Sequence, residues 1–294
     1  MLLDEYIHKK APDRSLYHYT SIDALYSMCE EKENQEIWAT NAAYMNDSQE
    51  LLYAFTLFKQ MLHKKVNDYS DEHKTYFKIL EQYLSDSVEL TSFIYVYSLS
   101  EECNSLSQWR SYTPHGKGVC LEYDMDTISG LTKDDGIHFV KCEYDTDKQN
   151  GIINELVEKL KDDYDRVISN FSGVVPPSHT NTTAYEDIDK VVKVLAVIKH
   201  PAFHLEKEWR VVVTFHAAKE LDEKYRVGAS MLTPYVPVKF NEGFFIKSIM
   251  IGPTAHASLS AAALSRYLDS KSLKPRDSAA RIPVSSSNIP YREW

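Results

Sequence analysis

The stretch RSLYHYTSIDALYSMCE, residues 14–30, shows on a small scale how the chain is built. Its first part, residues 14–21, is predicted to form a short strand that ends at a Thr-Ser pair. Ser21 can then cap an amphipathic helix. The residues on one face of that helix are Ile22, Leu25, Tyr26 and Cys29. A strand is thus followed at once by a helix, and corners of this kind commonly carry functional side chains.

Short strands and amphipathic helices alternate along the rest of the chain. Further strands are predicted at EIWAT (36–40), SFIYVYSLS (92–100), GVCLEY (118–123), HFVKCEY (138–144), EWRVVVTF (208–215), YVPVKF (235–240) and FFIKSIMIG (244–252). Apolar residues at helical spacing predict helices that begin at Asp47, cover about 71–89 and 147–170, end near Lys199, and cover 257–271. Because strands are scattered among helices, we expect a single α+β domain over residues 1–294. It would have a largely antiparallel sheet and a helical insertion at about 47–90.

The polar stretch SGVVPPSHTNTT, residues 172–183, interrupts the helical pattern. Pro176 and Pro177 oppose helix formation, and the neighbouring Ser and Thr residues favour turns. We therefore expect a mobile loop at about 172–183.

Composition and charge exclude several classes of protein. Only nine glycines occur in 294 residues, and only Gly116 and Gly118 have the Gly-x-Gly spacing, so neither a P-loop nor a Rossmann fingerprint can be written. The formal charge of −10 opposes non-specific binding to nucleic acid unless basic residues cluster in the fold. No motif of a Ser or Cys nucleophile is present either.

The sequence predicts a cytoplasmic protein that does not associate with a membrane. Its first ten residues, MLLDEYIHKK, carry Asp4 and Glu5 where a signal peptide would be positive. No apolar run approaches the roughly 18 residues that span a bilayer. The four cysteines lie far apart in the sequence and are expected to be reduced thiols.

Three polar clusters could carry chemistry, and each has a structural alternative. His18, within Tyr17-His18-Tyr19-Thr20, either binds a ligand or has its ring nitrogens satisfied by the backbone. Asn46-Asp47 with Glu50 could hold a ligand hydroxyl, although Asp47 as a helix cap explains most of this signal. Gln108-Trp109-Arg110 offers a stacking face beside an anion-binding guanidinium, unless Trp109 is a core residue and Arg110 an ion-pair partner.

Glu208 is the carboxylate that the sequence singles out. It opens the strand EWRVVVTF, where burial would desolvate it and make it usable in catalysis. A salt bridge to Arg210 or to a lysine is the alternative. His200, His204 and Glu208 recur every four residues, as metal ligands on a helix do. Pro201 disfavours helix at His200 and Glu208 begins a strand, so we expect no metal site there.

Seven short motifs, in a fixed order, resemble a bacterial family catalogued as a domain of unknown function. They are LYHYTSIDAL (16–25), IWATNAAYMNDSQE (37–50), SLSQWRSY (105–112), GKGVCLEYD (116–124), KHPAFHLEKEWR (199–210), IGP (251–253) and SSNIPYR (286–292). That family is in turn distantly similar to the ADP-ribosyltransferase superfamily, which includes DarT-type toxins and poly-ADP-ribose polymerases. The resemblance implies an ADP-ribosyltransferase-like fold with a split, largely antiparallel sheet.

The resemblance also implies roles for particular residues. His18 matches the histidine on the superfamily's first strand, and Glu208 matches the glutamate that opens a later strand. Both would be catalytic and would share one cleft, with NAD as substrate and His18 among its binding residues. Cys120 stands where the polymerases have a tyrosine, so the ring that stacks on nicotinamide would come from another residue. The candidates for that ring are Tyr44, Trp109 and Tyr123, and the other residues implied to bind NAD are Tyr19, Thr20, Asn46 and Arg110.

The resemblance leads us to expect NAD-dependent transfer of ADP-ribose to a nucleic acid or a protein, by a toxin or phage-defence effector. An antitoxin or chaperone partner is implied in the same way. Two other classes stay open. One is a non-catalytic nucleotide- or protein-binding module, which the loss of tyrosine at Cys120 favours. The other is a metal-dependent nuclease-type effector that would use Asp47, Glu50 and Glu208.

Overall fold

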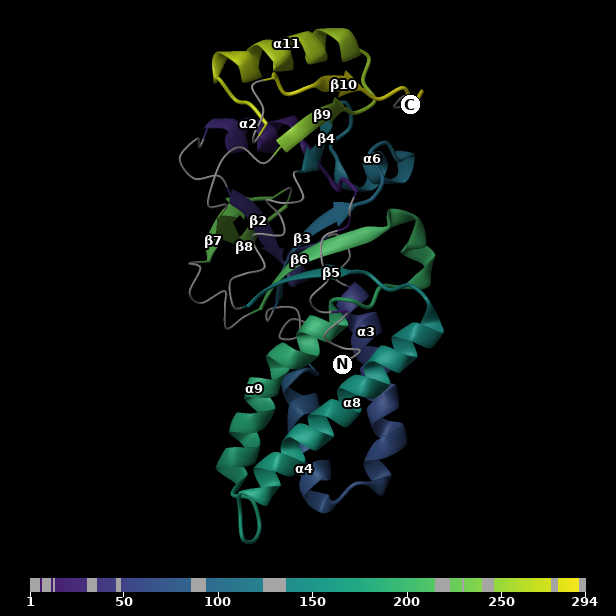
Figure 1. Ribbon diagram of the computed structural model, residues 1–294, viewed down its shortest axis with the longest axis vertical. Helices are drawn as coiled ribbons and strands as arrows, with labels where there is room; N and C mark the ends of the chain where they lie inside the picture. Colours follow the sequence, from purple (N-terminus) through teal and green to yellow (C-terminus); the bar gives the residue numbers. More distant parts are fainter. Residues whose placement is uncertain are drawn as a thin grey trace.

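The computed structural model describes most of the chain. The described residues are 6, 12, 14–30, 36–45, 49–85, 94–123, 136–214, 223–228, 230–239, 246–275 and 280–290, without the side chains of residues 49 and 50. Over these residues the molecule is elongated, with long helices at one end, a sheet in the middle and shorter helices at the other end (Figure 1).

Ten strands form one sheet in the described residues. They are β1 (Tyr17–Ser21), β2 (Glu36–Asn41), β3 (Ile94–Ser100), β4 (Gly118–Tyr123), β5 (Ile137–Lys141), β6 (Glu208–Thr214), β7 (Lys224–Val227), β8 (Leu232–Lys239), β9 (Ile246–Ile251) and β10 (Val284–Ser286). Aromatic and β-branched residues are frequent in the central strands because they pack well on a buried, pleated surface. Every pair of strands is antiparallel except β9 with β10. This confirms the expected mixture of helices with a largely antiparallel sheet.

The sheet parts along one edge of β3. The other edge of β3 pairs with β6 over the whole strand. On the parted edge, β1 pairs with β3 only at Ser100, and β2 pairs with it only at Tyr95 and Val96. Residues 97–99 therefore have no strand partner on this edge, and β1 and β2 diverge on either side of them.

Four helices form a bundle below the sheet (Figure 1). They are α3 (Gln49–Lys65), α4 (Asp71–Tyr83), α8 (Thr146–Ser169) and α9 (Pro177–Leu195). The predicted insertion at 47–90 supplies only α3 and α4, and a distant part of the chain supplies the other two helices. One pair of amphipathic helices would leave its apolar faces in water. The second pair covers them, and Phe55 and Phe58 of α3 share a core with Ile153 and Leu156 of α8.

The loop predicted at 172–183 is shorter than expected. Residues 170–176 connect α8 to α9, and α9 begins at Pro177. Proline is well accommodated at the first position of a helix, where its missing N–H would have no intrahelical partner. Thr180 is buried, and its Oγ1 lies 2.8 Å from the hydroxyl of Tyr164 in α8. The prediction was therefore wrong for 177–183, because packing against α8 outweighs the turn preference of Ser and Thr.

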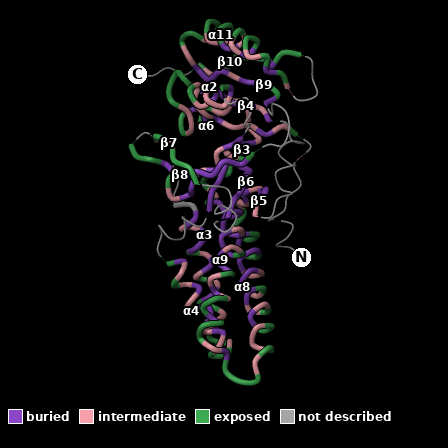
Figure 2. Tube along the Cα trace, turned by 90° about the vertical axis from the view of Figure 1, so that its left-hand side faces the viewer, coloured by how far each residue is buried: buried purple, intermediate pink, exposed green. Residues whose placement is uncertain are grey.

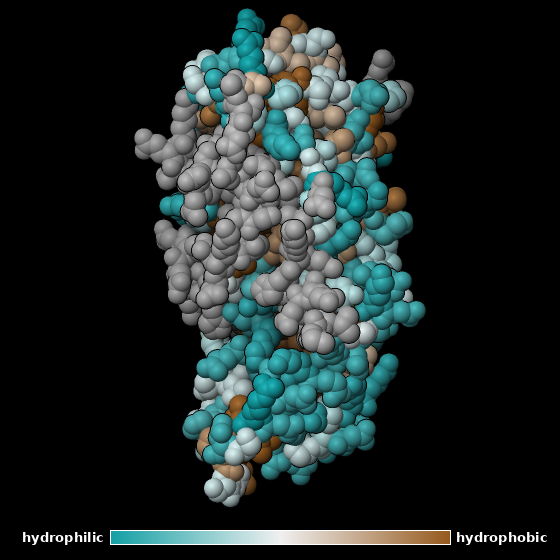
Figure 3. Space-filling view, in the orientation of Figure 1, coloured by the Kyte–Doolittle hydropathy of each residue, from teal (hydrophilic) through white to brown (hydrophobic). Residues whose placement is uncertain are grey.

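Two hydrophobic cores cover the two faces of the sheet. The bundle core continues into the sheet through Val96 of β3. On the opposite face, Leu99 belongs to a second core with Leu25 of α2 (Ile22–Glu30) and Leu264 of α11 (Ala257–Ser270). Buried residues run through both cores, and exposed residues lie on the outside of the bundle, whose visible surface is mostly hydrophilic (Figures 2 and 3). No helix in the described part of the chain is long and apolar enough to cross a membrane.

The bundle face of the sheet changes from apolar to polar near the point where the sheet parts. Side chains alternate between faces along a strand, so Ser98 and Ser100 follow Ile94 and Val96 on one face of β3. On the neighbouring β6, Glu208 and Arg210 precede the apolar residues. Polar side chains are thus collected beside the unpaired edge of β3.

Candidate functional site

A cavity of about 260 Å³ lies where β1 and β2 diverge. Its walls combine aromatic rings with a few polar groups, as small-molecule sites commonly do. The wall residues used below are His18 and Thr20 of β1, Trp38 and Thr40 of β2, Tyr97 and Ser98 of β3, Arg226 of β7, and Tyr44. The parting of the sheet therefore creates a cleft within the sheet itself.

His18 is held in one orientation at this cleft. Its Nδ1 lies 2.8 Å from the carbonyl oxygen of Ser98, and its ring stacks on Tyr97 with centroids 4.1 Å apart. Because a carbonyl can only accept, Nδ1 carries the proton and Nε2 is left as an acceptor. Burial, helped by a smaller effect of the charge of Arg226, lowers the pKa of His18 to about 4, although the hydrogen bond to Ser98 opposes this shift. The ring is therefore neutral at pH 7.

A smaller cavity of about 60 Å³ adjoins the first. The two share wall residues, including His18, Ser98 and Tyr112. The smaller cavity is also lined by Glu206, at the end of the 3₁₀ helix η3 (Pro201–Glu206), and by Glu208 at the start of β6. His18 and Glu208 thus line one cleft, although they are far apart in the sequence.

The carboxylate of Glu208 is surrounded by donors. Arg210 donates from Nε to Oε1 at 3.0 Å and from Nη2 to Oε2 at 2.8 Å, and Lys199 Nζ donates to Oε2 at 2.6 Å. The thiol of Cys142 lies 3.6 Å from the same Oε2. Burial by itself would raise the pKa of Glu208, but Arg210 and Lys199 outweigh it and hold the pKa well below its usual value. The salt-bridge alternative for Glu208 is therefore the arrangement that the structure shows.

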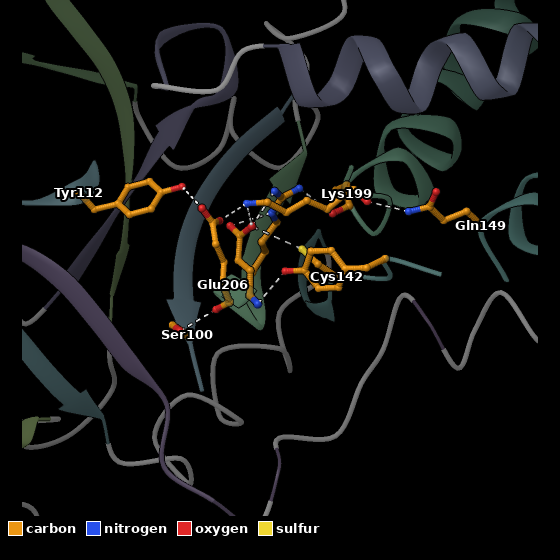
Figure 4. A network of polar contacts seen from close by, with 10 residues as sticks. Ser100, Tyr112, Cys142, Gln149, Lys199 and Glu206 are labelled. Atoms are coloured by element: carbon orange, nitrogen blue, oxygen red, sulfur yellow. Dashed lines mark hydrogen bonds and ion pairs between the residues drawn. The ribbon is translucent and has the colours of Figure 1, made fainter. Parts of the chain in front are cut away.

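Glu206 accepts fewer hydrogen bonds than Glu208. Its Oε1 accepts from the hydroxyl of Tyr112 at 2.9 Å, and its Oε2 accepts from Lys199 Nζ at 2.5 Å. Tyr112 and Lys199 approach it from opposite sides in Figure 4. Burial raises the pKa of Tyr112, so its hydroxyl stays protonated and can donate. A carboxylate has about four acceptor positions, and the side chain of Glu206 is 13% exposed against 6% for Glu208. Glu206 therefore keeps acceptor capacity at the cavity wall.

The backbone between the two glutamates is unusual. Lys207 has φ 45° and ψ 50°, a left-handed conformation that is uncommon outside glycine. It separates the 3₁₀ helix from β6. On either side of it, Ser100 Oγ donates to the carbonyl of Glu206 at 2.7 Å, and the N–H of Glu208 donates to the hydroxyl of Tyr144 at 3.0 Å. These contacts hold both carboxylates beside Lys199.

Two aromatic residues that were predicted to bind NAD are interior residues. Trp109 is buried against Tyr19 and Cys120, and its Nε1 donates to Asn104 at 2.9 Å. Tyr123 is fully buried, and its hydroxyl is hydrogen-bonded to that of Tyr97. Neither ring presents a face to a ligand, because core packing covers both. Tyr44, which is 45% exposed and lines the larger cavity, is the predicted stacking residue that the structure leaves available.

Of the other residues expected to bind NAD, two line the larger cavity and the others do not or are not described. Thr20 and Tyr19 reach the cavity walls, but the hydroxyl of Tyr19 already donates to the carbonyl of Glu102 at 2.7 Å and accepts from Ser105 N at 3.0 Å. Arg110 is exposed on α6 (Leu106–Tyr112) and is absent from the walls of both cavities, so the structure does not support it as a pyrophosphate ligand. Asn46 lies outside the described residues.

The predictions about metal ligands concern two groups of residues. His200 precedes η3, its Nδ1 accepts from Ala202 N at 3.2 Å, and Glu208 lies in β6. His200, His204 and Glu208 therefore do not share a helix, as expected. Asp47 and the side chain of Glu50 lie outside the described part of the chain. Within that part, no group of three His, Cys, Asp or Glu side chains is placed to hold a metal ion.

The sequence pattern did not point to four residues of the site, Arg226, Trp38, Glu206 and Lys199. Lys199 precedes η3 and Glu206 is its last residue, and the two meet only because the chain turns back there. Arg226 lies in the short edge strand KYRV, which shows no helical or strand pattern long enough to recognise. The sequence feature that could have indicated the site was the change from apolar to polar residues along one face of β3, at Ser98 and Ser100.

Another cavity, of about 330 Å³, lies elsewhere, between α2, α11 and the glycine turn at 116–118. Its walls are mostly apolar and include Lys117, but none of the residues that line it is a carboxylate or a histidine. Gly116 has φ +69°, and a Cβ on Gly118 would lie 2.4 Å from Thr113 Oγ1. The geometry of the turn therefore requires glycine at both positions. The cleft at β3 remains the candidate site, because it combines an acceptor, a cation and a carboxylate.

A family described as "Protein of unknown function (DUF2971)" matches residues 108–211, which is less than half of the chain. The match includes Lys199, Glu206, Glu208 and Arg210, and it supports resemblance to a domain of unknown function. No curated protein and no solved structure matches the chain. None of these comparisons links the chain to ADP-ribosyltransferases.

Proposed function

We propose that the cleft binds NAD and breaks its nicotinamide–ribose bond, so that ADP-ribose is transferred to a macromolecular acceptor. The observation that carries this proposal is the placement of a neutral His18, Arg226 and Glu206 around two adjoining cavities. The larger cavity, about 260 Å³, lies just below the range of roughly 300–1,000 Å³ for ligand sites, and the adjoining cavity adds to it. A split sheet with a histidine on its first strand also accords with the resemblance described above.

The chemistry requires an anionic group near the ribose. When the bond between C1′ of the ribose and the nicotinamide nitrogen breaks, the electron pair leaves with nicotinamide and positive charge develops on the ribose. An acceptor nucleophile then bonds to C1′ and releases its proton to solvent water. A positioned carboxylate stabilises the developing charge.

We assign this carboxylate to Glu206, which departs from what the resemblance implies. Glu206 lines the cavity and keeps acceptor capacity, whereas the oxygens of Glu208 are engaged by Arg210 and Lys199. Glu208 instead acts as a positioning residue, because it holds Lys199, which in turn contacts Glu206.

Other wall residues suit the rest of the substrate. Nε2 of His18 can accept a hydrogen bond from a ribose hydroxyl, since Nδ1 is engaged by Ser98. Trp38 stacks on Tyr235 with centroids 4.6 Å apart and lines the larger cavity, so its position is fixed by packing. Trp38 and Tyr44 provide the aromatic faces that a nicotinamide or adenine ring requires.

Incubation with labelled NAD and cell lysate tests the proposal. We expect release of nicotinamide and transfer of label, and the distribution of label among protein, DNA and RNA identifies the acceptor. Glu206→Gln should lower the rate by roughly 10²–10³-fold, as the loss of one electrostatic contact to a transition state typically does. Glu186→Gln, on an exposed position of α9, is the matched control and should leave the rate unchanged. Absence of nicotinamide release by the unmodified protein would refute the proposal.

A non-catalytic nucleotide-binding module is the second candidate, and the full engagement of Glu208 favours it. Such a module would show a higher melting temperature with NAD, because a ligand that binds only the folded state stabilises it. It would release no nicotinamide. A metal-dependent nuclease is not favoured, because donors of the chain itself occupy the oxygens of Glu208.

The biological role that we propose, a toxin or phage-defence effector with an antitoxin or chaperone partner, rests on the resemblance. Expression of the unmodified protein in bacteria should arrest growth, and expression of the Glu206→Gln variant should not. Equal growth with both proteins would contradict this role.

A further inference from the structure

Arg226 has no carboxylate partner among the described residues. It lies in β7, and its Nη2 donates to Thr40 Oγ1 of β2 at 2.9 Å. The other charged groups of the cleft are paired within the protein, Arg210 with Glu208 and Lys199 with both glutamates. Arg226 is only partly exposed. A partly buried cation without a counter-charge is unfavourable unless an anion from outside completes it.

A second polar group near Arg226 also lacks a partner. Ser98 Oγ is buried and has no hydrogen-bond partner in the described part of the structure. Ser98 and Arg226 line the same cavity, together with Thr40. A hydroxyl and a guanidinium beside one cavity are the donors that phosphate oxygens accept from.

The charge of Arg226 extends into the cleft. It is one of the influences that lower the pKa of His18, so a positive potential is present along this wall. The carboxylates Glu206 and Glu208 line the smaller, adjoining cavity. Among the described residues, the cleft therefore has an unpaired cation at its β7 end, and at its η3 and β6 end it has two carboxylates that are paired with Lys199 and Arg210.

We infer that the β7 end of the cleft is a phosphate subsite in which Arg226 and Ser98 bind the diphosphate of a nucleotide. This inference rests on the proposed function, and it specifies how the substrate is oriented in the cleft. The diphosphate lies at Arg226, and the ribose that loses nicotinamide lies toward His18 and Glu206. Arg226 thus takes the anion-binding role that was expected of Arg110.

Calorimetric titration with ADP and with adenosine tests the subsite without any reaction. A hydrogen bond to a charged group is worth roughly 1.5–3 kcal/mol, so Arg226→Gln should weaken ADP binding by roughly 10- to 100-fold. Adenosine affinity should change less than about twofold, because adenosine carries no phosphate. Arg226→Lys should lose less affinity than Arg226→Gln, since it keeps the charge.

Two matched controls accompany these variants. Arg266→Gln, on an exposed position of α11, and Arg110→Gln, on α6, should bind ADP as the unmodified protein does. Failure of the unmodified protein to bind ADP would overturn the inference. An unchanged ADP affinity in Arg226→Gln, or a selective loss in Arg110→Gln, would overturn it as well. If Arg226→Gln does not fold, Arg226→Lys decides the matter, because its ADP affinity must fall while its adenosine affinity stays.

The outcome is separable from that of the proposed function. ADP binding that depends on Arg226, in a protein that releases no nicotinamide from NAD, would support the subsite and refute the transferase. Cleavage of NAD with an unchanged KM in Arg226→Gln would refute the subsite and support the transferase.

Discussion

The two ends of the cleft differ in how their charges are balanced. At the η3 and β6 end, Glu208 meets Arg210 and Lys199, and Lys199 also meets Glu206. At the β7 end, the described residues offer Arg226 one threonine hydroxyl and offer Ser98 Oγ no partner. Within these residues, the charges of the first group are balanced without a ligand, and the charge of Arg226 in the second is not. The difference indicates that paired charges hold the cleft in shape, whereas the unpaired end gains most from a bound anion.

The difference has a physical cause. A buried charge is tolerated when another charge and further hydrogen bonds compensate its lost hydration. Glu208 receives this compensation from residues close to it in sequence, Lys199 and Arg210. For Arg226, which lies on an edge strand, we infer that the ligand supplies it.

Replacing Glu208 tests the paired end and should have the largest effect. Glu208→Gln keeps the shape of the side chain but removes the charge that pairs with Arg210 and Lys199. Breaking a buried ion pair in this way typically costs about 3–5 kcal/mol of unfolding free energy. Urea unfolding followed by circular dichroism measures this loss, and Glu186→Gln should stay within about 0.5 kcal/mol of the unmodified protein. If Glu208→Gln is as stable as the unmodified protein, the ion pairs of Glu208 with Arg210 and Lys199 do not stabilise the fold.

The pH dependence of stability tests the neutral state of His18, which lies between the two ends. Its pKa falls from 6.5 to about 4 on folding. Between these values the unfolded chain binds a proton that the folded protein does not. The part of the unfolding free energy that depends on neutral His18 is therefore fully present above pH 6.5, and it is lost as the pH falls toward 4. From pH 7 to pH 5 the unmodified protein should lose about 2 kcal/mol more than His18→Asn.

An exposed histidine provides the control for that measurement. His204→Asn, in η3, should show the same pH dependence as the unmodified protein. If His18→Asn also follows the unmodified protein, His18 titrates normally, and its Nε2 is not a constant acceptor at neutral pH.

The left-handed residue between the two glutamates offers the smallest effect. A non-glycine residue in this conformation is disfavoured by roughly 1–2 kcal/mol, so Lys207→Gly should be more stable than Lys207→Ala by about 1 kcal/mol. Both variants remove the exposed ion pair of Lys207 with Glu102, so the comparison isolates the backbone. Thermal unfolding measures the difference. Equal stability of the two variants would mean that the turn at Lys207 relaxes without strain.

Much of the fold was predictable because local patterns control it. Strands were expected close to β1, β2, β3, β4, β5, β6, β8 and β9, where aromatic and β-branched residues cluster. The grouping of α3 and α4 with α8 and α9 was not predictable. Each helix shows its apolar face in the sequence, but the identity of the partner helix depends on contacts between distant segments.

The candidate site was predictable only in part. His18 was singled out because its strand leads directly into a helix, and Glu208 because it begins a strand. Trp109 and Tyr123 were candidates for the stacking ring and are interior residues, which is the alternative that the sequence left open for Trp109. An aromatic residue has the same local pattern in a core and at a ligand site, so the sequence could not decide between them. Arg226 went unnoticed because nothing near it in the sequence marks it as unpaired.

The residue pattern alone was sufficient for the class of fold, the main strands and the two residues that first pointed to a site. Folding decided that β1 and β2 diverge along one edge of β3, that Glu208 is paired while Glu206 keeps acceptor capacity, and that Arg226 lies at the cleft. The reason is that propensity and periodicity act over a few residues, whereas charge pairing and burial depend on which distant segments come together.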